Sequence, residues 1–295
     1  MNYLFGAVLV LLSNATISVA NVFDGELTRK TFSSIWSIVI INGLILLPAI
    51  PLMFFIFDPA LITGVQLLLM LAIAAIDFFY QFPYYKALRY AETSVVTSFF
   101  SFGKILVPIF AYFVINERLT TLQYVGFGII VLCSIATSFK GSAFKAKKAM
   151  MYMLPVVVIL AMQSVLEKYG LGQIDWKSFY FYSFALSAPF YLVSLFFIRS
   201  ARAEVMEFLR KPFQKKYSPI FIQNIATWVA GVFGTLALSM LPVTITKAVG
   251  SFHSLFVHFV ASKGDKLHIG SKEKISIRKI ILFLLIGIGV FLTLR

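Results

Sequence analysis

The chain has 295 residues and a formal net charge of +14, yet only 13% of its residues are charged, about half the share found in ordinary soluble domains. Hydrophobic residues make up 60%, so too few charged side chains remain to cover a soluble protein of this length. The basic residues form short clusters between apolar segments, a pattern typical of membrane topology rather than of nucleic-acid binding. The composition predicts an all-α integral membrane protein and argues against a nucleic-acid partner.

Ten apolar segments approach the roughly 20 residues that a membrane-spanning helix needs. They cover residues 3–23, 35–57, 62–88, 94–115, 121–139, 149–170, 178–198, 218–241, 243–262 and 278–294. The longest connection, residues 199–217, is rich in Lys and Arg and predicts either an interfacial amphipathic helix or a solvated charged loop. We therefore expect ten transmembrane helices in one multi-pass membrane domain.

The two halves of the chain align after a shift of 150 residues. The shift places "ALRYAETSVVTSFFSF" (87–102) on "ALSMLPVTITKAVGSF" (237–252), and a further slip of two residues places "NERL" (116–119) on "GDKL" (264–267). Each half then holds five helices, and an odd number inserts the halves in opposite senses. The expected organisation is two inverted five-helix repeats, residues 1–140 and 141–295.

The segment "YYKALRYAETSVVTSFFSFGKILVPIFAYFVINERLT" (84–120) resembles the EamA-like ten-helix branch of the drug/metabolite transporter superfamily. The resemblance rests on the turn Ala87–Ser94 and on the "ERL" turn Glu117–Leu119. It implies an alternating-access carrier with a central cavity, a small-molecule substrate and no particular substrate class. We expect a monomer or homodimer in a lipid bilayer, specifically a bacterial plasma (inner) membrane.

Polar side chains follow one face of the fourth and ninth predicted helices at steps of four, three and four residues. These two stripes are Thr97, Ser101, Lys104 and Pro108, and Lys247, Ser251, Ser254 and His258. Polar groups facing lipid are costly, so both stripes should line protein or water near the midplane. Lys104 lies near the middle of its helix, whereas Lys247 lies roughly 9 Å from the middle of its own, which favours a gate position, a cavity mouth or an interfacial lysine.

The third predicted helix has a stripe of Asp77, Tyr80, Gln81 and Tyr84. Asp77 is the candidate counter-charge for Lys104, either in a structural ion pair or in a pair that opens when substrate binds or Asp77 takes a proton. Trp228 in the eighth predicted helix is a further substrate-binding candidate, and the secondary cavity candidates are Asn14, Ser18, Gln163, Glu167 and Asn224. Their alternative role is hydrogen bonding between helices.

Charge narrows the substrate class. The expected first helix, residues 3–23, contains no acid, unlike the small multidrug exporters of this superfamily, which rely on a glutamate there. Two intramembrane lysines also repel cations, so we expect a zwitterionic or anionic metabolite, such as an amino acid or a phosphorylated compound. Coupling to protons is left open.

The sequence motifs give little support for enzyme activity. The acids are scattered, "HSLFVH" (253–258) lacks the spacing and the acid of a metalloprotease helix, and there is no glycine-rich phosphate loop. We expect no enzyme activity, no cofactor and no metal site. A flippase for a lipid-linked substrate and a non-transporting scaffold or sensor are the alternatives to a carrier.

The orientation in the membrane is predicted differently by two arguments. Alternate loops on one side of the predicted topology hold 20 Lys and Arg residues, while the side with both termini holds 5. The positive-inside rule then places both termini away from the cytoplasm, whereas the family resemblance implies cytoplasmic termini.

Overall fold

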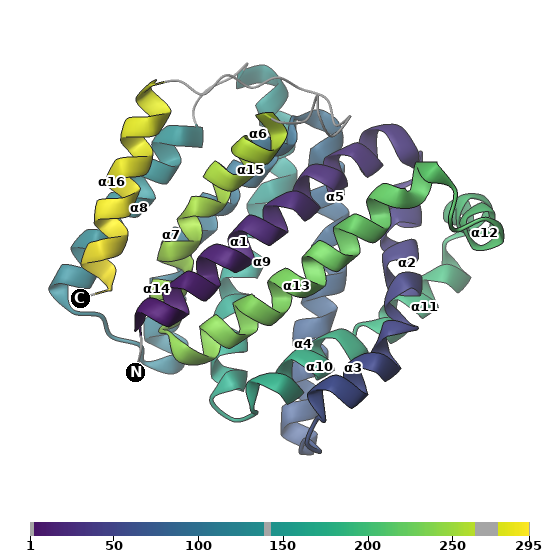
Figure 1. The fold of residues 1–295 in the computed structure, drawn as a ribbon, viewed down its shortest axis with the longest axis horizontal. Coiled ribbons are helices and arrows are strands. Elements are labelled where there is room, and N and C mark those ends of the chain that lie inside the picture. Colours follow the sequence, from purple (N-terminus) through teal and green to yellow (C-terminus); the bar gives the residue numbers. More distant parts are fainter. Residues whose placement is uncertain (1–2, 139–142, 263–276, 295) are drawn as a thin grey trace.

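The computed structural model describes residues 3–138, 143–262 and 277–294. These residues form a helical bundle (Figure 1). Its helices are α1 (Tyr3–Glu26), α2 (Ile35–Leu46), α3 (Ala49–Phe57), α4 (Gly64–Phe79), α5 (Gln81–Tyr90), α6 (Thr93–Ser98), α7 (Phe100–Ile115), α8 (Thr121–Ser138), α9 (Ala143–Leu171), α10 (Trp176–Ala185), α11 (Ala188–Phe197), α12 (Arg202–Arg210), α13 (Ser218–Met240), α14 (Val243–Val249), α15 (His253–Ser262) and α16 (Ile277–Thr293). The expected boundary at 140/141 and the "GDKL" segment lie outside the described residues.

Within the described residues, seven helical stretches are long and apolar enough to cross a membrane, or eight if one bent pair counts as a single span. The seven are Tyr3–Thr31, Gly64–Tyr90, Thr93–Ile115, Lys147–Leu171, Trp176–Phe197, Lys215–Met240 and Val243–Ser262. Two shorter apolar helices, Thr121–Cys133 and Leu284–Thr293, fall within the remaining predicted segments. The chain is therefore a multi-pass integral membrane protein.

The predicted segment 35–57 is broken in the structure. Its two halves, α2 and α3, meet at an angle of 48° across Leu47 and Pro48. Proline removes a backbone donor and its ring crowds the preceding turn, which explains a bend at this point.

Two long helices, α1 and α13, lie side by side across the bundle, and α8 and α16 form a separate pair at one edge (Figure 1). The α8–α16 pair packs very closely because glycine faces glycine. A Cβ atom on Gly126 would lie 2.6 Å from the carbonyl oxygen of Gly289, and a Cβ atom on Gly289 would lie 2.8 Å from the oxygen of Gly126. Small residues commonly permit such backbone contact between membrane helices.

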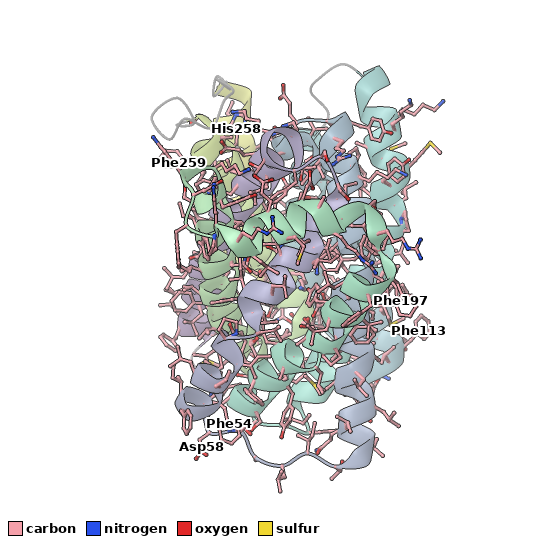
Figure 2. All side chains as sticks on the ribbon, turned by 90° about the vertical axis from the view of Figure 1, so that its right-hand side faces the viewer. Phe54, Asp58, Phe113, Phe197, His258 and Phe259 are labelled. Atoms are coloured by element: carbon pink, nitrogen blue, oxygen red, sulfur yellow. The ribbon has the colours of Figure 1, made fainter. Side chains whose placement is uncertain are left out.

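The outer surface of the bundle is apolar. Phe113 and Phe197 are 78% and 80% exposed, and both project away from the helices in Figure 2. Large apolar side chains on the outside are unfavourable in water but suit the acyl chains of a bilayer.

The basic connection after α11 was expected to form either an amphipathic helix or a charged loop. It contains a short helix, α12. Val205 and Phe208 are buried, and α12 packs against α2. Glu204 accepts hydrogen bonds from the backbone N–H and hydroxyl of Ser33. Partial burial alone would raise the pKa of Glu204, but hydrogen bonds, chiefly from Ser33, outweigh that effect and lower it.

Two helical spans are interrupted at positions related by the 150-residue shift. The break between α6 and α7 lies at Phe99, and a single turn of 3₁₀-helix, Gly250–Phe252, separates α14 from α15. Interrupted helices leave backbone groups free to bind ligands or side chains. Both breaks lie beside the cavity described next.

Candidate functional site

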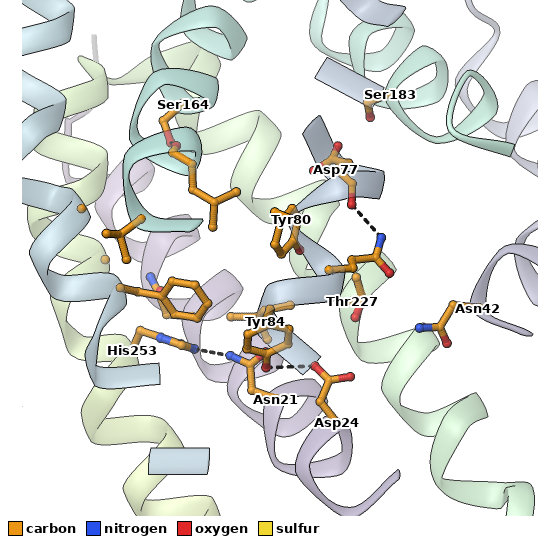
Figure 3. Close-up of a pocket in the computed structure, with 18 of the residues that line it drawn as sticks. Asn21, Asp24, Asn42, Asp77, Tyr80, Tyr84, Ser164, Ser183, Thr227 and His253 are labelled. Carbon is orange, nitrogen blue, oxygen red and sulfur yellow. Dashed lines mark hydrogen bonds between the residues drawn. The ribbon is translucent and has the colours of Figure 1, made fainter. Parts of the chain in front are cut away.

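A cavity of about 410 Å³ lies inside the bundle. Figure 3 shows side chains that converge on it from several helices. Residues of α1, α2, α4, α5, α7, α9, α10, α13, α14 and α15 contribute to its wall. This volume falls in the range of small-molecule sites, and the wall combines aromatic rings with a few charged groups.

Two lysines line this cavity, Lys104 on α7 and Lys247 on α14. The ammonium of Lys104 donates to the carbonyl oxygen of Gly250 at 3.0 Å and to Oγ of Ser251 at 3.2 Å. It therefore reaches the 3₁₀ turn that interrupts the α14–α15 span. A lysine has three donors, so one of them remains available. Neither lysine forms an ion pair within the described part of the chain.

A cluster of amides and carboxylates surrounds Asp77 near the end of α4. Nε2 of Gln163 donates to Oδ1 of Asp77 at 2.7 Å and lies 3.2 Å from Oε1 of Glu167. Gln81 donates to the backbone oxygen of Asp77 and to the hydroxyl of Tyr191, both at 2.7 Å. The side chain of Asp77 faces the cavity, and Gln163 occupies only one of its two oxygens.

A second carboxylate, Asp24, lies near the end of α1 and is only 4% exposed. Tyr85 donates its hydroxyl hydrogen to Oδ1 of Asp24 at 3.0 Å. The Tyr84 hydroxyl lies 3.2 Å from Oδ2 of Asp24 and 3.3 Å from Oδ1 of Asn21. Nδ2 of Asn21 lies 2.9 Å from Nε2 of His253. Because an amide NH₂ can only donate, the imidazole accepts through Nε2 and carries its proton on Nδ1.

The same hydrogen-bond chain continues across the bundle toward α13. Nδ2 of Asn42 donates to the Tyr85 hydroxyl at 3.1 Å, and Nδ2 of Asn224 donates to Oδ1 of Asn42 at 2.9 Å. Side chains of α15, α1, α5, α2 and α13 are thus linked in one polar network around the cavity. Each of these polar groups would be unfavourable alone in the interior of a membrane protein, and its hydrogen-bond partner offsets that cost.

Comparison with known proteins finds a match in the first half of the chain. Residues 4–139 match the family model described as the EamA-like transporter family. This match confirms the resemblance of residues 84–120 to the EamA-like branch of the drug/metabolite transporter superfamily.

Among 28 matching chains of solved structures, one crystal structure of a protein aligns over 98% of this chain and 94% of its own, with a TM-score of 0.58 and 15% identity. At that identity the likeness shows a shared fold alone. A search of curated proteins gave no match. The family match is confined to residues 4–139, whereas the likeness in fold extends over almost the whole chain.

The structure brings most of the site residues expected from sequence to one cavity. Its wall includes Asn14, Asp77, Tyr80, Gln81, Tyr84, Lys104, Asn224, Trp228 and Lys247. Gln163 and Glu167 lie behind Asp77, as described above. Ser251 is buried outside the cavity wall and accepts a hydrogen bond from Lys104. Ser18 instead bonds to the backbone. Its buried hydroxyl lies against the backbone oxygens of Asn14 and His253.

Ser101 and His258 are buried and lie outside the cavity wall. Ser101 shares a helix face with Lys104, but only Lys104 of the two borders the cavity. His258 lies more than one turn beyond His253 on α15 and is too far along the helix to reach the cavity.

The expected ion pair between Lys104 and Asp77 is wrong. Lys104 bonds to Gly250 and Ser251, while Asp77 bonds to Gln163, so the two charges belong to different parts of the wall. Lys247 lines the same cavity as Lys104, and the difference in depth expected between the two lysines stays a prediction.

The expectation of a first helix without an acid is wrong as well. The span continues to Thr31, beyond the expected end at residue 23, and therefore includes Asp24. Sequence reasoning also left Asn42, Tyr85 and His253 out of the site. A single asparagine in the apolar segment "IINGL" was the available signal for Asn42, since a lone amide in a membrane span needs a partner.

Proposed function

We propose that the protein is a secondary carrier for a small zwitterionic metabolite. In this proposal, ten spans form two inverted five-helix repeats, and the halves move against each other to expose the cavity to either side. The family assignment supports transport, and the interrupted helices at corresponding positions support the repeat. Proteins of this family act as transporters rather than enzymes. We place the carrier in a bacterial plasma (inner) membrane, which membrane fractionation tests.

The observation that carries the substrate class is that neither cavity lysine has a carboxylate within ion-pair distance among the described residues. An unpaired ammonium inside a membrane protein is unfavourable. A carboxylate or phosphate on the substrate would supply the missing charge at Lys104 and Lys247. The free donor of Lys104 and the whole ammonium of Lys247 are available for that contact.

The positive group of a zwitterionic substrate would bind at a different part of the cavity wall. Asp77 offers a free carboxylate oxygen to the cavity, and the rings of Tyr80 and Trp228 lie in the same wall. A carboxylate together with aromatic faces is a favourable environment for an ammonium group. Acidic and basic walls in one small cavity fit a zwitterion, such as an amino acid, better than a purely anionic compound.

Uptake into proteoliposomes tests the proposal. Purified protein is reconstituted and loaded with unlabelled amino acids, and counterflow of a labelled mixture of the standard amino acids is measured. We expect Lys104→Met to abolish counterflow while the protein still folds, with a thermal unfolding midpoint lowered only by the loss of two hydrogen bonds to the 3₁₀ turn. Lys177→Met, at an exposed position on α10, is the matched control and should transport normally.

Three results would contradict the proposal. Near-normal counterflow by Lys104→Met would remove the lysine from the substrate site. Movement of lipid-linked compounds alone would indicate a flippase. No movement of any compound from a panel of amino acids, nucleotides and phosphorylated metabolites would favour a scaffold or sensor; a thermal-shift screen with the same panel would show whether any of them binds.

A further inference from the structure

Asp24 differs from the other charged groups of the cavity because both of its oxygens are already occupied. Tyr85 donates to Oδ1 and Tyr84 lies 3.2 Å from Oδ2, in a side chain that is 4% exposed. Asp24 forms no ion pair with a described lysine or arginine. An ionised carboxylate that is buried with only hydroxyl donors around it is energetically unfavourable. A substrate could bind to either Asp24 oxygen only by breaking one of these contacts.

The Tyr84 hydroxyl faces two acceptors with a single hydrogen. It lies 3.2 Å from Oδ2 of Asp24 and 3.3 Å from Oδ1 of Asn21, so it can satisfy only one of them at a time. If a proton adds to Oδ2 of Asp24, the new acid O–H can donate to the Tyr84 oxygen. The Tyr84 hydrogen can then turn to Asn21, and every acceptor in the group has a donor.

We propose that Asp24 is the site at which the carrier binds and releases a coupling proton. One proton adds to the carboxylate, its charge is neutralised, and no other covalent bond forms or breaks. The two hydrogen-bond patterns of Asp24, Tyr84 and Asn21 differ by that proton and by the direction in which the Tyr84 hydroxyl donates. This inference rests on the proposed carrier function and adds its coupling ion.

The proton site is connected to the lysine wall. Asn21 bonds to His253, which directly follows the 3₁₀ turn where Gly250 and Ser251 accept from Lys104. A change in the hydrogen bond that Asn21 accepts from Tyr84 is therefore felt, through the Asn21 amide and His253, next to the interrupted segment that also holds Lys104. This contact gives protonation a route to the substrate-binding wall.

The surroundings of Asp24 contain few other groups that could take or give a proton. The titratable side chains that face it are Tyr84 and Tyr85 on α5, Tyr80 just before α5, and His253 on α15 behind Asn21. Nearby charged groups of its own span are engaged elsewhere, since Arg29 donates to the carbonyl oxygens of Leu88 and Ala91 and Glu26 pairs with Lys30. Lys104 and Lys247 line other parts of the cavity. Asp77 keeps a free oxygen for a substrate, whereas Asp24 does not.

Transport driven by a pH gradient tests the site. Proteoliposomes are studied with the labelled mixture of standard amino acids as probe, with the membrane voltage held at zero and a pH gradient imposed in either direction. We expect the wild type to accumulate the probe under one gradient, and Asp24→Asn to lose that accumulation while substrate counterflow persists. Accumulation by Asp24→Asn at the wild-type level would overturn the proposal.

Infrared spectroscopy tests the site without any substrate. The carboxylic acid stretching band of the purified protein is titrated with pH in the wild type, Asp24→Asn and Tyr85→Phe. We expect one titrating band to be missing from Asp24→Asn. In Tyr85→Phe the loss of a donor to the ionised form should move that band's midpoint upward by about one pH unit.

Identical titrations in the wild type and Asp24→Asn would overturn the proposal, and so would an unmoved band in Tyr85→Phe if Asp24→Asn fails to fold. If the wild type shows no counterflow of the probe, the proposed carrier function fails in this assay. The infrared result still decides whether Asp24 is the proton site.

Discussion

Lys104 and Lys247 differ in how much of their hydrogen-bonding capacity the protein already uses. Lys104 donates to two groups of the 3₁₀ turn, so its charge also stabilises an interrupted helix. Lys247 lines the same cavity and makes no hydrogen bond or ion pair with the described residues. In the proposed carrier, Lys104 therefore combines a structural contact with substrate binding, while Lys247 acts through the substrate alone.

Lys247→Met should accordingly impair binding more than turnover. Loss of one charged hydrogen bond costs about 1.5–3 kcal/mol, which corresponds to a rise in KM of about tenfold or more. We expect kcat for counterflow to change little, because the contact between α7 and the 3₁₀ turn is unaffected. Initial rates over a range of amino-acid concentrations measure both constants, with Lys177→Met as the reference. A KM equal to that of the wild type would exclude Lys247 from the anion site.

Individual residues show where sequence reasoning succeeds and where it stops. Helical spacing correctly grouped Asp77, Tyr80, Gln81 and Tyr84 on one face that borders the cavity. Spacing says which residues share a face but not which faces meet, and for that reason it paired Asp77 with Lys104 incorrectly. Asp24 was missed because the expected helix ended one residue too early, and helix ends are the least certain part of any such prediction.

At the scale of elements, one residue of the first half stabilises a helix of the second. Glu117 follows α7 and accepts hydrogen bonds from the backbone N–H groups of Val243 at 2.8 Å and Thr244 at 3.0 Å. These are the first residues of α14, whose N–H groups have no partner within the helix. The carboxylate also complements the positive end of the helix dipole. The "ERL" turn thus connects the two halves.

Glu117→Ala should therefore destabilise the protein. Loss of a helix cap typically lowers the free energy of unfolding by about 1–2 kcal/mol, so the thermal unfolding midpoint of the protein in detergent should fall. Glu92→Ala is the control, because Glu92 directly precedes α6 but its side chain makes no capping hydrogen bond. Equal midpoints for the two variants would show that the Glu117 contacts do not contribute to stability.

The elements themselves were largely predictable, whereas their interruptions were not. Each apolar segment expected to span the membrane contains a helix, because segment length and hydropathy are strong signals in a bilayer. The bend after α2 had a visible cause in Pro48. The 3₁₀ turn Gly250–Phe252 depends on contacts with Lys104 from another helix, which no local pattern reveals.

The molecule as a whole is asymmetric in charge. In the sequence, 20 of the 26 Lys and Arg residues fall after α1, in the last turns of α5, around the starts of α9 and α16, and around α12. In Figure 1, α1 begins and α16 ends at the lower left, opposite the upper end where α9 and α16 begin. In the predicted topology these 20 residues lie on the side away from both termini.

This asymmetry predicts the orientation of the protein. Loops rich in Lys and Arg remain in the cytoplasm, so both termini should lie on the opposite side of the membrane. Alkaline phosphatase fused to the C-terminus should be active in bacterial cells, and a green fluorescent protein fusion at the same position should remain dark. Fusions in the basic connection around α12 are the matched control and should give the reverse pattern. Fluorescent C-terminal fusions would show instead that the termini are cytoplasmic and that the charge bias follows another constraint.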